Sequence, residues 1–196
     1  MPRSYMVPLS SPLLLLMLGA AGQDARMLNP EYTVTNVGGG LGVFVDEKVI
    51  IGRVPQGAGS ARWLAERIRR DRNWCGAKDA SGKCAAADTQ VHDWIDSARC
   101  KALTTAMTTL WDLPPVRFLP PGETMFVSDS ATVTVRSNTR QAGYGTPLSI
   151  SQEEGDYARW WHAASNSLKP CWQASPPLVE GQPLAARLSS PTSAPQ

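Results

Sequence analysis

The segment Trp94–Pro115 (WIDSARCKALTTAMTTLWDLPP) limits what this chain can fold into more than any other stretch. The residues leading into it, Thr89–Ile95, alternate as a half-buried strand does. Apolar residues then recur at intervals of three and four, which predicts an amphipathic helix with one cysteine in its buried stripe. Asp96 or Ser97 is the expected N-cap, and two prolines end the helix. The stripe consists of Cys100, Leu103, Met107 and Leu110, with Trp111 packed beside it.

Two further helices are predicted. Ser60 can cap an arginine-rich helix over residues 61–72, with Ala61, Leu64, Ala65 and Ile68 on its apolar face. The last helix spans residues 153–168 and ends at Lys169-Pro170. Its apolar stripe consists of Tyr157, Trp161, Ala164 and Leu168, with Trp160 adjacent.

Short β-rich runs account for most of the remaining chain. Residues 32–37 predict a strand, and residues 43–51 predict either a hairpin or one long bent strand. A hairpin is expected between residues 124–127 and 131–135, and residues 147–151 predict a further strand. Mixed elements with at least one hairpin favour an α+β fold, in which two or three helices pack on one face of an antiparallel sheet.

The N-terminus has the pattern of an export signal. Arg3 precedes the apolar run that begins at Leu13, and cleavage after Ala21 or Gly22 would satisfy the small-residue rule. That run is about half the roughly 20 residues that span a bilayer. We therefore expect residues 1–22 to be a cleaved signal, with an uncleaved anchor or a disordered leader as alternatives. The mature chain is then expected in the periplasm or outside the cell, with no membrane span.

Four cysteines in an exported chain are expected to form disulfides, and four allow three connectivities. Cys75 and Cys84 flank a polar loop, GAKDASGK, which has no large apolar residue to hold it closed. Cys100 and Cys171 lie on or beside predicted helices. We therefore predict the pairs Cys75–Cys84 and Cys100–Cys171. A zinc site is the alternative, but the chain has no C-x-x-C spacing and two histidines only.

The pieces WIDSARCKAL, its proline stop and the later LKPCW resemble a set of small exported proteins of alpha-proteobacteria. The resemblance covers roughly residues 91–172. It implies export and agrees with a Cys100–Cys171 disulfide, but it implies no activity, fold or ligand. The matching residues are Trp94, Asp96, Ser97, Cys100, Leu103, Cys171 and Trp172.

No catalytic, metal or cofactor motif is recognisable, so we assign no catalytic residue, metal ligand or cofactor. The glycine cluster at residues 38–42 has neither dinucleotide-binding nor phosphate-loop spacing. His92 lies in a predicted strand beside Asp93, whose side chain must point to the opposite face. His162 lies off the apolar stripe of the last helix. A small periplasmic hydrolase that uses His92 or His162 is therefore the alternative and not the leading hypothesis.

A binding surface is the more favoured function. Trp63 and Trp160 are expected to be exposed, and Arg67 and Arg70 belong to the arginine-rich segment, so these four residues are the candidate binding residues. The formal charge of +2 is too small to favour nucleic acid. The sequence thus predicts a non-catalytic binding or envelope-associated module whose partner is an envelope protein or a glycan. It would consist of one domain over residues 23–172, followed by a disordered Pro/Ser-rich tail over residues 173–196.

Overall fold

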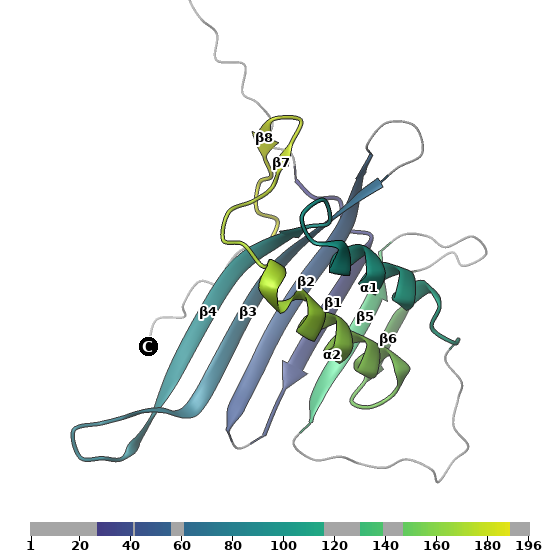
Figure 1. Ribbon diagram of the computed structural model, residues 1–196. Coiled ribbons are helices and arrows are strands. Elements are labelled where there is room, and N and C mark those ends of the chain that lie inside the picture. The colour runs from purple at the N-terminus through teal and green to yellow at the C-terminus, as the bar shows by residue number, and fades with distance from the viewer. Residues whose placement is uncertain (1–26, 41, 56–60, 116–129, 139–146, 189–196) are drawn as a thin grey trace, which may run out of the picture.

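Six strands form one antiparallel sheet in the order β4-β3-β2-β1-β5-β6 in the computed structural model (Figure 1). The structure describes residues 27–40, 42–55, 61–115, 130–138 and 147–188. The predicted signal, residues 1–22, lies outside the described residues. The strands are β1 (Tyr32–Gly38), β2 (Val43–Pro55), β3 (Ala61–Lys78), β4 (Cys84–Asp96), β5 (Ala131–Ser137) and β6 (Ser149–Gln152).

Two helices cover one face of this sheet, α1 (Lys101–Trp111) and α2 (Asp156–Leu168), and a short 3₁₀ helix, η1 (Lys169–Cys171), follows α2. Figure 1 shows α1 and α2 side by side across β1, β2 and β5, whereas the β3–β4 hairpin extends past them. This arrangement confirms the predicted α+β fold. The buried stripes of both helices pack on strand residues such as Val34, Val49 and Val133.

Both predicted disulfides are present. Cys100 at the N-terminus of α1 bonds to Cys171 at the end of η1, which joins the two helices, and Cys75–Cys84 closes the tip of the β3–β4 hairpin. The helix begins later than predicted because residues 97–99 form a turn first. Asp96 caps that turn by accepting the Ala98 N–H at 2.9 Å.

The predicted helix over residues 61–72 is wrong, since these residues form the first part of strand β3. Trp63, Leu64 and Ala65 are at most 4% exposed although they are consecutive. A surface helix buries one stripe, whereas a strand covered on both faces buries successive residues. β3 pairs with β2 from Ala61 to Asn73 and with β4 from Leu64 onward, and these long ladders override the local helical pattern.

The predicted hairpin between residues 124–127 and 131–135 is described only in its second half, because residues 124–127 lie outside the described residues. Strand β5 pairs with β1 along its whole length and with β6 between Val133 and Arg136. Residues 43–51 belong to one long strand, β2, which decides between the two alternatives left open for them.

Residues 178–188 cover part of the second face of the sheet, so the predicted disordered tail is wrong for residues 173–188. Residues 189–196 lie outside the described residues. The tail forms a small hairpin of β7 (Leu178–Val179) and β8 (Gln182–Pro183). A second apolar cluster forms on this face of the sheet. It joins the sheet residues Ile50, Leu64 and Trp94 to Leu28, Val179, Leu184 and Leu188.

Candidate binding surface

The four candidate binding residues do not lie together. Trp63 and Trp160 were expected to be exposed, and both are buried, at 4% and 5% exposure. Trp160 lies between the helices, where its indole N–H donates to the Ala106 carbonyl at 2.8 Å. Arg67 is largely buried under the helix layer, whereas Arg70 is half exposed on the opposite face of β3. The predicted exposure was wrong for Trp63 because this residue lies in a strand and not on a helix. It was wrong for Trp160 because this side chain faces α1 and not solvent.

Trp63 is buried because other side chains cover it. The Trp111 ring lies over it with ring centroids 5.7 Å apart, and the Arg53 guanidinium lies 5.1 Å from the ring centroid. Tyr32 contacts the same indole at 6.4 Å between centroids. We call this group the Trp111 cluster (Tyr32, Arg53, Trp63 and Trp111). It brings together the starts of β1 and β3, the end of β2 and the C-terminus of α1.

The exposed aromatic residue of the cluster is Trp111, with 52% of its surface accessible. Its indole N–H donates to the Tyr32 hydroxyl at 2.8 Å, which fixes the orientation of the ring. Arg53 lies over the Trp63 ring and is held there by Glu31, whose carboxylate accepts from Nε at 2.7 Å. A fixed, exposed indole beside a charged group can stack on a ligand and offer polar contacts at its rim. The sequence predicted that Trp111 packs beside the apolar stripe of α1, and its position at the margin of that stripe gave no signal of its exposure.

The arginines of β3 are matched by carboxylates on neighbouring strands. On the helix-covered face, Arg67 donates to both oxygens of Asp93, at 2.8 and 2.6 Å. Its guanidinium lies 4.0 Å from the centroid of the Trp172 ring. Glu47, which is 1% exposed, contacts Arg67 at 3.4 Å and accepts from the Trp161 indole at 3.2 Å. These charges therefore pair with one another and are not available for a ligand.

On the other face, Arg70 and Arg72 both bind the carboxylate of Asp88. Hydrogen bonds from Arg72 and Arg70 lower the pKa of Asp88 to about 2. Arg62 binds Asp96, and burial alone would raise the pKa of that carboxyl. The hydrogen bonds from Arg62 and from the Ala98 N–H outweigh this effect, so the pKa of Asp96 is lowered. Arg70 also lines a surface depression of about 240 Å³ with Lys48, Gln90 and Arg187.

His92 contacts a carboxyl that has a structural role. Its Nε2 lies 2.9 Å from Oε1 of Glu66, which is fully buried. Glu66 also accepts the backbone N–H of Arg187 at 3.0 Å and that of Leu188 at 2.9 Å. Glu66 thus fastens the C-terminal segment to the sheet, and no serine, threonine or cysteine hydroxyl or thiol bonds to His92 among the described residues.

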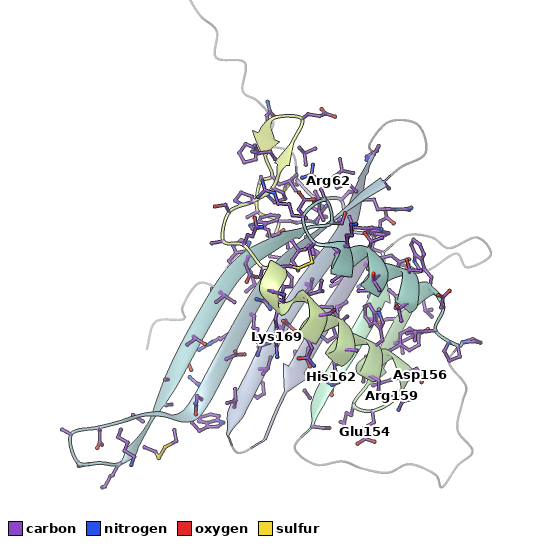
Figure 2. The ribbon with its side chains drawn as sticks, viewed as in Figure 1. Arg62, Glu154, Asp156, Arg159, His162 and Lys169 are labelled. Atoms are coloured by element: carbon purple, nitrogen blue, oxygen red, sulfur yellow. A yellow bond between two sulfur atoms is a disulfide. The ribbon has the colours of Figure 1, made fainter. Side chains whose placement is uncertain are left out.

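His162 lies on the outer, solvent-exposed side of α2, near Arg159 and Lys169 (Figure 2). Within the described ranges, no group of three or more His, Cys, Asp or Glu residues could hold a metal ion. No helix in the described part of the chain is both long and apolar enough to cross a membrane. His92 and His162 therefore lie on different elements, β4 and α2, and on opposite sides of the sheet.

No family model, curated protein or solved structure matches this chain.

Proposed function

We propose that this protein is an exported, non-catalytic binding module and that the Trp111 cluster is its binding surface. One observation carries the proposal: Trp111 is the most exposed tryptophan of the described residues, yet its ring is fixed by Tyr32 and Trp63. An aromatic side chain that is both exposed and held in place loses little conformational entropy on binding. A tryptophan with a purely structural role would be more stabilising if it were fully buried, so its exposure favours a binding role.

The proposed ligand is an envelope glycan. A sugar ring can stack its apolar face on an indole, and its hydroxyl groups need polar partners at the edge of the ring. Arg53 and Glu31 supply a donor and an acceptor next to Trp63, and the threonines Thr104 and Thr108 lie on the exposed side of α1. The two disulfides support export, since such bonds persist in oxidising compartments.

The observations on the histidines favour binding over hydrolysis. A hydrolytic histidine needs a nucleophile or an attacking water within hydrogen-bond reach and a group that orients the ring. Glu66 could orient His92, but its carboxyl already accepts two backbone N–H groups of the C-terminal segment. His162 lies on the solvent-exposed side of α2, and no hydroxyl, thiol or carboxylate of the described residues is hydrogen-bonded to it.

The test is cosedimentation of the purified protein with peptidoglycan sacculi, together with fluorescence titration by soluble N-acetylglucosamine oligomers. Trp111→Ala is expected to weaken binding about tenfold, which corresponds to about 1.4 kcal/mol of stacking. Trp111→Phe retains an aromatic face and should bind nearly as well as the wild type.

Trp74→Ala is the matched control for this experiment. Trp74 is 49% exposed and has the Arg72 guanidinium 5.2 Å from its ring centroid, but it lies near the opposite end of β3. This variant should bind like the wild type. Equal binding by Trp111→Ala and the wild type would exclude the Trp111 cluster as the surface, and cleavage of the oligomers by the wild type would support the hydrolase instead.

A further inference from the structure

Strand β4 forms one edge of the sheet and is thirteen residues long, whereas β6 at the other edge has four. Its inner side pairs with β3 along most of its length. On its outer side, Trp94 exchanges two backbone hydrogen bonds with Gln173, at 2.8 and 2.9 Å. Each residue of an antiparallel strand directs its N–H and C=O to the same side, and successive residues alternate. Asp88, Gln90 and His92 therefore direct theirs outward as well.

Those outward groups have no backbone partner among the residues that the structure describes. The chain itself could have extended the pairing that Gln173 begins, but Pro176 and Pro177 follow, and proline donates no backbone hydrogen bond. The segment instead turns to the second face of the sheet, where Val179 and Leu184 are buried. Within the described residues, the outer side of β4 from Asp88 to His92 is therefore left without a pairing strand.

Sequence features that usually protect a long edge strand are missing here. Lysine, proline or an unpaired charge commonly prevents association of sheet edges. Residues 85–93 contain neither lysine nor proline. The charge of Asp88 is matched by Arg70 and Arg72 within the same chain, and that of Asp93 by Arg67.

We propose that a second copy of this chain pairs with this edge, β4 against β4, about a twofold axis at Gln90. In that register Asp88 lies opposite His92 of the second copy, and His92 lies opposite its Asp88. Glu66 binds Nε2 of His92, so the Nδ1 side of the ring is available to the carboxylate across the axis. On the other face Thr89 lies opposite Val91, a pair of β-branched side chains that favours strand pairing.

Two features of β4 limit this pairing to five residues. Gln173 occupies the outer side of Trp94 at one end. At the other end, the register between β3 and β4 shifts between Asn73 and Ala77, so the regular strand is interrupted near Ala86. Between these limits the pairs at positions 88, 90 and 92 can each exchange two backbone hydrogen bonds. The register centred on Gln90 places the Asp88 carboxylate opposite the His92 imidazole, with which it can form a hydrogen bond, whereas one centred on Asp88 would place two carboxylates together.

The first test is sedimentation equilibrium of the purified full chain and two variants at Gln90. The Gln90 N–H points away from β3, so Gln90→Pro removes an outward donor and leaves the β3 ladder intact. The wild type and Gln90→Ala are expected at twice the monomer mass, and Gln90→Pro at the monomer mass with an unchanged circular dichroism spectrum. A wild type that stays monomeric as its concentration is raised, or a folded Gln90→Pro that still dimerises, overturns the proposal.

A second variant decides the question if Gln90→Pro does not fold. In the proposed register the two Gln90 Cα atoms lie about 5.5 Å apart, within the range of a disulfide. Gln90→Cys should therefore form a covalent dimer under mild oxidation, whereas Ser151→Cys on β6 should remain monomeric. Failure of Gln90→Cys to cross-link, or equal cross-linking by both variants, contradicts the pairing.

Discussion

At the scale of single residues, the buried charges of this protein hold strands and segments together. Glu66 is the clearest example, because a fully buried carboxyl accepts two backbone N–H groups from a segment more than a hundred residues away. Burying such a group is costly unless it is hydrogen-bonded, and here all its partners come from other elements. The carboxyl therefore acts as a fastening point for residues 187–188.

Glu66→Ala is expected to lower the free energy of unfolding by roughly 3 kcal/mol, because two backbone N–H groups lose their acceptor. Glu66→Gln keeps an acceptor oxygen at the same place and should lose less. Urea unfolding of both variants measures the difference. Equal losses in the two variants would mean that the hydrogen bonds to Arg187 and Leu188 contribute little.

At the scale of elements, the disulfides act on different parts of the fold. Cys100–Cys171 joins the start of α1 to the end of η1 across 71 residues, and Cys100 is buried in the helix-side core. Cys75–Cys84 spans nine residues of a hairpin whose strands already pair. Closing the longer loop removes more conformational entropy from the unfolded chain.

Replacing both Cys100 and Cys171 by serine is expected to cost roughly 4 kcal/mol, against roughly 3 kcal/mol for the pair Cys75 and Cys84. Urea midpoints, with the slope held in common, give the comparison. The order is contradicted if the hairpin variant is the less stable of the two. Double replacement avoids a free thiol in either protein.

At the scale of the whole molecule, the sheet has two covered faces. The helices cover one, and the segment from Leu178 to Leu188 together with Leu28 covers part of the other. The N-terminal segment approaches so closely that a Cβ added at Gly52 would lie 2.1 Å from the Asn29 carbonyl oxygen. The C-terminal segment is therefore part of the domain and shields Ile50, Leu64 and Trp94 from water.

A chain that ends at Pro177 is expected to lose roughly 3 kcal/mol of stability. Val179, Leu184 and Leu188 lose burial worth about 1.5–3 kcal/mol each, partly offset by the entropy that the segment regains. It should also bind a hydrophobic dye and aggregate on heating. A chain that ends at Leu188 is the control and should melt like the full protein; similar melting of the shorter chain would contradict the assigned role of the tail.

Local patterns determined the elements whose burial is one-sided. The stripe of Cys100, Leu103, Met107 and Leu110 predicted α1 and its buried face, and the polar segment between Cys75 and Cys84 predicted a loop closed by a disulfide. The same logic identified β1, β6 and most of α2, and it led to the α+β class. These features depend on neighbours a few residues away, which a sequence displays directly.

Only the tertiary structure decided the features that depend on contacts between residues far apart in the sequence. The local pattern of residues 61–72 predicted a helix, but these residues form a strand because they pair with β2 and β4. Since the sheet is covered on both faces there, the neighbouring residues Trp63 and Leu64 are both buried. Residues 173–188 have the composition of a disordered segment, yet Glu66 and the apolar face of β3 hold them in place. Trp111 is exposed because the positions around it are filled by Tyr32 and Trp63 from distant strands. Contacts between residues so far apart leave no periodic pattern in the local sequence, because they form only when the strands pair in the sheet.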